Sequence, residues 1–179
     1  MKKQIKIDDF IFEEYINHEI IQARVKEIAS IISIDYKDKE PVILITLKGA
    51  IIFAADLIRE LSIPVRIETI VAKSYGMKFV SNGNVEIINN AVDLKNKDII
   101  IVEDIVDTGV TMMQLLDNLT KEEPQSIAIC SFLFKPENLV KDVEIKYCGF
   151  SIPSLFVVGY GLDYAEHGRN LKDIYIKIK

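Results

Sequence analysis

Residues 99–111 constrain the fold of this chain more than any other stretch. They begin with an uninterrupted run of β-branched apolar residues, 99–102, which is typical of a strand buried on both faces, as in a parallel sheet covered by helices. Glu103, Asp104 and Asp107 follow, and a Gly-containing turn then leads into a run of helix-forming residues. We therefore predict a strand, a tight turn and a helix, with three carboxylates at the carboxyl end of the strand.

A turn of this kind can bind an anion. The free backbone N–H groups at a helix N-terminus and the helix dipole stabilise a phosphate, while neighbouring carboxylates can hold hydroxyl groups or a metal ion. A plain connecting loop with solvated acids is the alternative, and the strand-to-helix pattern alone does not exclude it.

A helix is predicted near the N-terminus of the chain. The acidic pair 8–9 is expected to cap this helix, and the acidic pair 13–14 to lie on its solvated side. Its buried stripe repeats at spacings of four, three and four residues, at Ile21, Val25, Ile28 and Ile32.

Apolar runs bounded by turn residues predict the strands. They lie at 42–46, 65–71, 99–102, 126–134, 143–147, 156–161 and 174–178. Because strands alternate with helices through the middle of the chain, we predict a doubly wound α/β sheet that binds ligands at the carboxyl ends of its strands. Lys48, the three acids and Lys135 fall at such ends. Taken alone, the turn at Lys48 is more typical of a plain strand-to-helix connection with a surface lysine.

Composition narrows the class of protein. At 179 residues, with 49% apolar and 27% charged residues, the chain is long enough for one domain with a sizeable core. A net charge of -5 argues against general nucleic-acid binding and against a basic membrane-binding role, and no apolar run approaches the length of a membrane span. Cys130 and Cys148 show no metal-binding spacing and are expected to be reduced core residues. We therefore expect a cytoplasmic protein.

Several separated motifs resemble those of one enzyme family. The pattern Glu-Asp-x-x-Asp-Thr-Gly-x-Thr at 103–111 resembles the phosphoribosyl pyrophosphate signature of type I phosphoribosyltransferases. Together with Leu-Lys-Gly at 47–49, Ser-Tyr-Gly at 74–76 and the segment 156–169, it is similar to the hypoxanthine-guanine phosphoribosyltransferases, and the resemblance covers nearly the whole chain.

The resemblance implies a fold and a reaction. The fold would be a single type I phosphoribosyltransferase domain with a mainly parallel sheet flanked by helices: a core at about 36–150, a small hood from about 1–12 and 151–179, and a mobile loop at about 73–90. The reaction would transfer a 5-phosphoribosyl group from phosphoribosyl pyrophosphate to hypoxanthine or guanine, giving IMP or GMP and pyrophosphate, with Mg²⁺ as cofactor. Relatives are homodimers or homotetramers, so self-association is also implied.

The resemblance also implies a role for each motif residue, beginning with Asp107 as the general base at purine N7. The phosphoribosyl group would be held by Glu103, Asp104, Thr108, Gly109, Val110 and Thr111. The purine would be held by Lys135, Phe156, Val157 and Asp163. Pyrophosphate would be bound by the backbone groups of Lys48 and Gly49, after a cis peptide bond between Leu47 and Lys48, and by the guanidinium of Arg169. The mobile loop would contribute Ser74 and Tyr75. The metal would be held by Glu103, Asp104 and Asp163.

Other functions are compatible with parts of the sequence. The signature alone also suits phosphoribosyltransferases for adenine, orotate or uracil, against which Lys135 and the Phe156–Val157 pair argue. A catalytically silent regulator that binds phosphoribosyl pyrophosphate or a nucleotide would be expected to carry a basic face or an added domain, and neither is visible in the sequence. A dinucleotide-binding oxidoreductase is disfavoured because no GxGxxG pattern follows a strand. The use of xanthine stays open.

Overall fold

A five-stranded parallel sheet forms the centre of the protein. The computed structural model describes residues 2–71 and 93–178, so the predicted loop at 73–90, with Ser74 and Tyr75, lies outside the described residues. The strand order is β4-β3-β5-β6-β7, and every neighbouring pair is parallel. The strands are β3 (Val42–Leu47), β4 (Arg66–Val71), β5 (Asp98–Val106), β6 (Ser126–Phe134) and β7 (Tyr147–Ser151).

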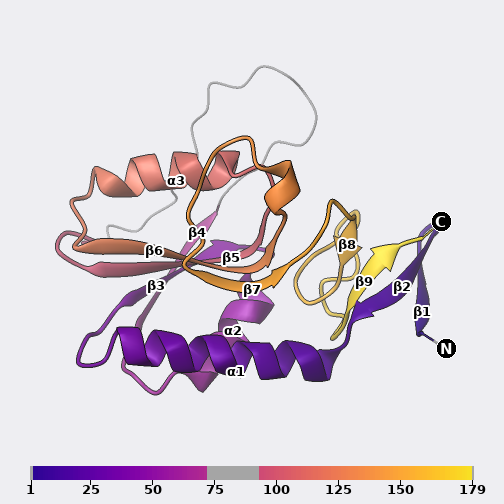
Figure 1. The fold of residues 1–179 in the computed structure, drawn as a ribbon, viewed down its shortest axis with the longest axis horizontal. Coiled ribbons are helices and arrows are strands. Elements are labelled where there is room, and N and C mark those ends of the chain that lie inside the picture. The colour runs from indigo at the N-terminus through magenta and orange to yellow at the C-terminus, as the bar shows by residue number, and fades with distance from the viewer. Residues whose placement is uncertain (1, 72–92, 179) are drawn as a thin grey trace.

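Helices cover both faces of this sheet. Helices α1 (His18–Asp35) and α2 (Ile51–Glu60) pack on one face, and α3 (Val110–Thr120) packs on the other (Figure 1). In β5, Ile99 and Ile101 belong to the core beneath α3, whereas Ile100 and Val102 belong to the core beneath α1 and α2. The unbroken apolar run therefore arises because successive side chains enter opposite, equally dry layers, which confirms the predicted doubly wound arrangement.

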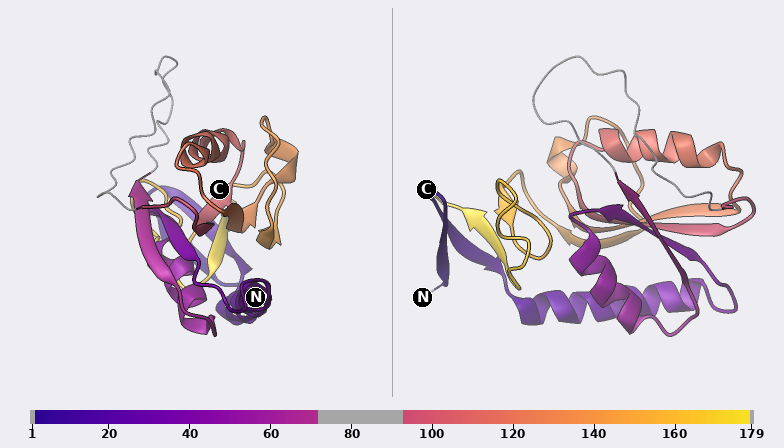
Figure 2. Two further views of the ribbon diagram at one scale, coloured as in Figure 1. Left: turned by 90° about the vertical axis from the view of Figure 1, so that its left-hand side faces the viewer. Right: turned by 180° about the vertical axis from the view of Figure 1, so that it is seen from behind.

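A smaller antiparallel sheet joins the two ends of the chain. Its order is β1-β2-β9-β8, with β1 (Gln4–Ile7), β2 (Phe10–Ile16), β8 (Val157–Val158) and β9 (Ile174–Lys177). Phe12, Val158 and Tyr175 form its own buried cluster. Both ends of the chain lie on this sheet, which we call the hood, and it stands beside the carboxyl-terminal edge of the parallel sheet (Figures 1 and 2).

The N-terminal prediction was correct for the buried stripe and wrong for the helix start. Ile21, Val25, Ile28 and Ile32 are all buried in α1, but α1 begins only at His18 and is capped by Asn17, whose side chain accepts a hydrogen bond from the Ile20 N–H. The acidic pair 8–9 instead lies at the turn between β1 and β2, and the pair 13–14 lies in β2. Pairing with β9 from the far end of the chain, which no local pattern encodes, makes this stretch a strand.

Three strand boundaries also differ from the prediction. The central strand, predicted at 99–102, is β5 and continues through Glu103 and Asp104 to Val106, because β6 pairs with it over that whole length. The strand expected at 143–147 begins only at Tyr147, and the one expected at 156–161 is limited to β8. By contrast, β6 spans its predicted range.

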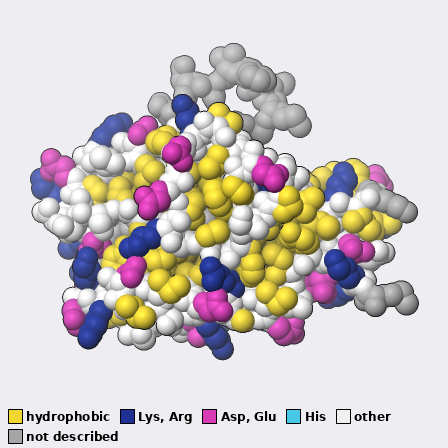
Figure 3. All heavy atoms as spheres, viewed as in Figure 1, with side chains coloured by type: hydrophobic (Ala, Val, Ile, Leu, Met, Phe, Trp, Pro, Cys, Tyr) yellow, Lys and Arg dark blue, Asp and Glu magenta, His cyan; other side chains and the backbone are white. Residues whose placement is uncertain are grey.

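The surface carries both signs of charge. Figure 3 shows Lys and Arg side chains interspersed with Asp and Glu on the face it presents, without a broad area of positive charge among the described residues there. In the part of the chain that the structure describes, no helix has the length and apolar character needed to cross a membrane.

Candidate active site

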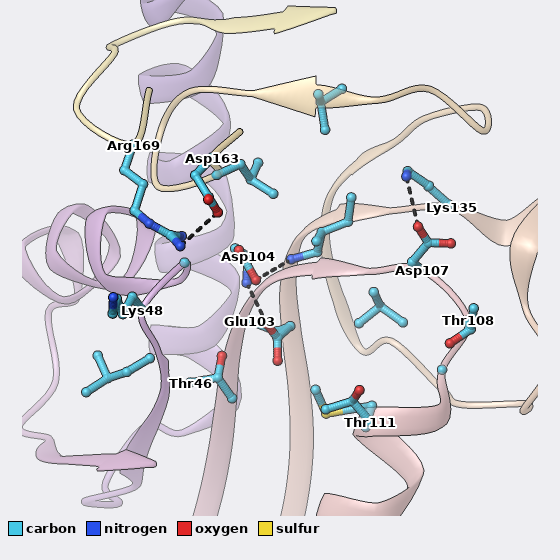
Figure 4. A pocket seen from close by; sticks show the side chains of 18 of the residues that line it. Thr46, Lys48, Glu103, Asp104, Asp107, Thr108, Thr111, Lys135, Asp163 and Arg169 are labelled. Carbon is cyan, nitrogen blue, oxygen red and sulfur yellow. Dashed lines mark hydrogen bonds and ion pairs between the residues drawn. The ribbon is translucent and has the colours of Figure 1, made fainter. Parts of the chain in front are cut away.

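One cavity of about 870 Å³ collects almost all the predicted site residues. It opens at the carboxyl ends of β3, β5 and β6, and the segment 156–169 of the hood side faces it (Figure 4). Among the described residues, every predicted site residue lines it except Val110, which is the first residue of α3 and is 38% exposed. The phosphate, purine and pyrophosphate motifs, which are scattered through the sequence, thus meet around one space.

The turn between β5 and α3 is held in shape by a glycine. Gly109 has a φ of 76° and caps α3, and a Cβ at this position would lie 2.4 Å from the Lys141 carbonyl oxygen. On the outer side, the Thr108 carbonyl accepts hydrogen bonds from the N–H groups of Val140 and Lys141. Because the first N–H groups of a helix have no intrahelical acceptor, this turn can present donors to an anion in the cavity. We call residues 107–111 the phosphate loop.

Glu103 and Asp104 form a crowded acidic pair. Asp104 packs directly against the backbone of Gly49, where a Cβ would lie 1.7 Å from its Oδ2 atom. Desolvation of Glu103, reinforced by the neighbouring Asp104 carboxyl, raises the pKa of Glu103 well above its usual value. A cation beside the pair would relieve this repulsion, and carboxylate oxygens are ligands that Mg²⁺ accepts.

Asp163 lies across the cavity, but it already has a partner. Its Oδ1 atom is 2.7 Å from the Arg169 guanidinium (Figure 4). No group of three or more candidate metal ligands comes together among residues 2–71 and 93–178. The donor set therefore suits an ion that keeps several waters and takes further oxygens from a phosphorylated ligand, as Mg²⁺ does.

Asp107 and Lys135 form an ion pair on the side of the cavity where the resemblance places the purine. The Lys135 Nζ atom is 2.9 Å from Asp107 Oδ2, and the Lys135 side chain is largely buried (Figure 4). Asn138 donates from Nδ2 to the other carboxylate oxygen, Oδ1, at 2.7 Å. Partial burial acts to raise the pKa of Asp107, but the hydrogen bonds from Lys135 and Asn138 and the lysine charge outweigh it and bring this pKa below its usual value. Asp107 is therefore ionised at neutral pH.

A second set of ion pairs spans the opposite side of the cavity. Lys48 lies 3.1 Å from Glu166 Oε2, and Arg169 contacts both Asp163 and, at 3.5 Å, Glu166. The peptide bond between Leu47 and Lys48 is cis, as the resemblance implied. The resemblance implies that Lys48 binds pyrophosphate through its backbone and Arg169 through its guanidinium, and the side chains of both residues are bridged here by the exposed carboxylate of Glu166.

The aromatic side chain of Phe156 also lines the cavity. Phe156 is 49% exposed, and its ring meets the Tyr164 ring edge-on at a centroid distance of 5.8 Å. The adjacent Val157 is buried and pairs through its backbone register with β9. A half-exposed ring at the cavity wall is suited to stacking on a flat heterocycle.

Sequence reasoning missed three residues that shape the cavity. Buried Thr46 donates to the Val102 carbonyl at 2.9 Å, Asn138 holds Asp107, and Glu166 bridges the two cations. Only Glu166 had a usable signal, because it lies between two predicted site residues, Asp163 and Arg169. The other two gain their roles from contacts with residues that are distant in the sequence, Thr46 with Val102 and Asn138 with Asp107.

The sequence and the fold both match known proteins. Residues 12–165 match the family model described as "Phosphoribosyl transferase domain". The hypoxanthine-guanine phosphoribosyltransferase of Aquifex aeolicus is 39% identical over 163 residues, covering 90% of this chain and 92% of that protein. That of Bacillus subtilis is 40% identical over 157 residues, covering 87% of each.

A crystal structure of a hypoxanthine-guanine phosphoribosyltransferase from Bacillus anthracis superposes on this fold with a TM-score of 0.86. It is 37% identical in sequence and covers 98% of this chain and 99% of its own. Identity at this level over nearly full length, together with the shared fold, places the chain within the phosphoribosyltransferase family, among the hypoxanthine-guanine phosphoribosyltransferases.

Proposed function

We propose that this protein transfers the 5-phosphoribosyl group of phosphoribosyl pyrophosphate to a 6-oxopurine, forming IMP from hypoxanthine or GMP from guanine. The observation that carries the proposal is the Lys135–Asp107 pair, which sets a donor and an acceptor 2.9 Å apart on one wall of the cavity. Neighbouring positions on a 6-oxopurine offer the complementary groups, the 6-oxo oxygen and the N7 proton. The Aquifex aeolicus and Bacillus subtilis relatives carry this activity in their names.

The purine is selected by its 6-substituent. Lys135 donates to the 6-oxo oxygen, Phe156 stacks on the ring, and the Val157 backbone meets the edge that bears the 2-substituent. An amino group at position 6 would leave the N–H group of Lys135 that points at it without an acceptor, although Asp107 still accepts another; this costs about 1–3 kcal/mol and disfavours adenine. Asp107, ionised in this setting, accepts the N7 proton as the purine attacks C1 of the sugar.

The phosphorylated substrate is held at the other positions. The N–H groups and hydroxyls of the phosphate loop bind the 5′-phosphate, and Glu103 and Asp104 approach the ribose hydroxyls. Lys48 and Arg169 bind the pyrophosphate group, for which both must exchange their contacts with Glu166. Mg²⁺, held by Glu103, Asp104 and Asp163, would neutralise charge on the departing pyrophosphate.

We also propose that the protein self-associates as a homodimer or homotetramer. Large apolar side chains are exposed at Ile51 and Ile52 on α2 and at Ile67 on β4, which supports a buried contact there. Size-exclusion chromatography with light scattering tests this proposal, and a monomer at micromolar concentration would refute it.

The function is tested by incubating the protein with phosphoribosyl pyrophosphate and Mg²⁺ and with hypoxanthine, guanine, xanthine or adenine in parallel. Turnover of the first two bases, little with adenine and a large loss of rate in Asp107→Asn are expected. The xanthine arm decides the open question of that substrate. Tight binding of phosphoribosyl pyrophosphate without turnover of any base would instead indicate a regulator.

A further inference from the structure

The segment that follows β6 is fastened to the phosphate loop. It comprises residues 136–141, beginning with a short 3-10 helix (Pro136–Asn138). Its backbone bonds to the Thr108 carbonyl through the N–H groups of Val140 and Lys141, at 3.0 and 3.1 Å. Gly109 leaves no room between the two, since a Cβ there would collide with the Lys141 carbonyl. The segment and the loop therefore behave as one packed unit, and a side chain on the segment can act on the loop.

Asn138 is the side chain on this segment that reaches Asp107. Its Nδ2 atom lies 2.7 Å from Oδ1, while Lys135 holds Oδ2 at 2.9 Å, so each carboxylate oxygen has its own donor. The two donors come from opposite ends of one turn, and the Asn138 N–H bonds the Lys135 carbonyl at 3.1 Å. Two donors on separate oxygens fix the rotation of a carboxylate, which a single donor leaves free to turn about its Cβ–Cγ bond.

We propose that Asn138 is a positioning residue, which holds the Asp107 carboxylate in the orientation that accepts the purine N7 proton. This inference rests on the proposed function of Asp107. Asn138 does not touch the purine itself. It acts because an ionised carboxylate only accepts hydrogen bonds, so the amide must present its NH₂ group and thereby favours the ionised form.

The effect of Asn138 on Asp107 can be tested separately, because, in the part of the chain that the structure describes, few other charged groups surround this carboxylate. Lys135 is the charged side chain that acts on Asp107 among the described residues, and it approaches from the end of β6. The phosphate loop on the other side contributes Thr108 and Gly109, which carry no charge. With Lys135 left in place, a change at position 138 alters one hydrogen bond and no existing ion pair.

Two variants separate positioning from packing. Asn138→Ala removes the donor, and Asn138→Asp keeps the shape but replaces the donor with a negative charge. Glu137→Ala, an exposed residue of the same turn, is the matched control. The rate of IMP formation is measured from pH 9 down to the lowest pH at which each variant stays folded, at saturating and limiting hypoxanthine, with Asp107→Asn as a reference. Melting temperatures are recorded for all variants.

The expected result is a loss of kcat on the order of 10-fold in Asn138→Ala, smaller than the ~100-fold that a misplacement of about 1 Å can cost, with a smaller change in KM. The acidic limb of the pH profile moves to higher pH, because the ionised form of Asp107 loses a stabilising donor, and it moves further in Asn138→Asp because like charges repel. Glu137→Ala behaves as the unchanged protein.

Four outcomes overturn the inference. If the Asn138 variants melt at lower temperature but keep the original pH profile and kcat, Asn138 only stabilises the turn. If Glu137→Ala shifts the profile equally, the effect belongs to the turn and not to the amide. If Asp107→Asn retains full activity, the proposed role of Asp107 fails as well, whereas a large loss in Asp107→Asn with silent Asn138 variants refutes the positioning role alone.

Discussion

Replacing Gly161 by alanine should damage both stability and the pyrophosphate site. Gly161 has a φ of 103°, and a Cβ built on it would lie 2.0 Å from the Gly49 carbonyl oxygen. Gly168, in the same region of the chain, has a φ of 95°, but its added Cβ would first meet the flexible end of Ile7, at 3.1 Å. Both glycines therefore adopt a positive φ that disfavours alanine, but only Gly161 lies so close to another backbone atom that a Cβ would collide with it.

The structure gives the size of both effects. An alanine held at such a positive φ costs about 1–3 kcal/mol, which both variants incur. Only Gly161→Ala adds a collision with backbone, for which overpacking data suggest a further cost of about 1–3 kcal/mol. For a protein of this length each kcal/mol lowers the melting temperature by about 2–4 °C, so Gly161→Ala should melt about 2–12 °C below Gly168→Ala.

The collision also has a functional consequence. The Gly161 carbonyl accepts a hydrogen bond from Arg169, and the Gly49 carbonyl packs against the Gly161 Cα atom. Gly161 therefore connects Gly49 with Arg169, and a shift that relieves the clash moves these two residues apart. KM for phosphoribosyl pyrophosphate should rise in Gly161→Ala and stay nearly unchanged in Gly168→Ala. Thermal melting and steady-state kinetics measure both quantities. Equal melting temperatures and equal KM values for the two variants would refute the argument from close approach.

Three further substitutions test the charged contacts. Lys135→Met should lower kcat/KM for hypoxanthine by about 10- to 100-fold, the value of a hydrogen bond to a charged partner. It should also reduce the ratio of kcat/KM for hypoxanthine to that for adenine, and an unchanged ratio would contradict the role of Lys135 at the 6-oxo group. Glu166→Gln should lower KM for phosphoribosyl pyrophosphate, because Lys48 loses its paired carboxylate and Arg169 keeps only that of Asp163. A constant or higher KM in kinetics at varied substrate would show that this is wrong. The pKa of Asp107 is lowered in the folded protein, so its ionised carboxylate stabilises the fold above the pKa of the unfolded chain, and this stability is lost as pH falls through the folded-state pKa. Asp107→Asn should therefore weaken the dependence of the unfolding free energy on pH on the acid side, measured by denaturant titration. An unaltered acid-side dependence would contradict the lowered pKa.

The core of the parallel sheet could be predicted from the sequence because it depends on local pattern. The run at 99–102 enters two dry layers at once, so its composition alone identifies a central strand. The range of β6 could likewise be predicted from the sequence. The N-terminal hairpin was not, because β2 owes its strand conformation to β9, which lies more than 150 residues along the chain. Non-local pairing overrides local helix and strand preference in such segments.

The site residues fall into the same two groups, those predictable from local sequence and those that depend on contacts between distant segments. Residues that act through fixed motifs, such as Asp107 and Arg169, were predicted at positions that line the cavity. Asn138 was missed because its role depends on how the segment after β6 folds back onto the phosphate loop. Gly161 was predicted only as the last residue of a strand at 156–161, and its contact with the Gly49 carbonyl requires knowledge of how the hood side meets the sheet edge.

The charges of the cavity explain how a protein of net charge -5 can be suited to a highly anionic substrate. Each binding cation is paired with a carboxylate of the same site: Lys135 with Asp107, Lys48 with Glu166, and Arg169 with Asp163. In the proposed binding mode, two of these pairs lie on the pyrophosphate side and exchange partners when substrate binds, whereas the Lys135–Asp107 pair persists because a 6-oxopurine complements both members at once. The site therefore obtains its attraction for anions from contacts that change locally and needs no positive field over the whole surface. The exposed pairs at Lys48 and Glu166 are weak enough to be exchanged at small cost, while the buried amine of Lys135 keeps the purine side organised before substrate arrives.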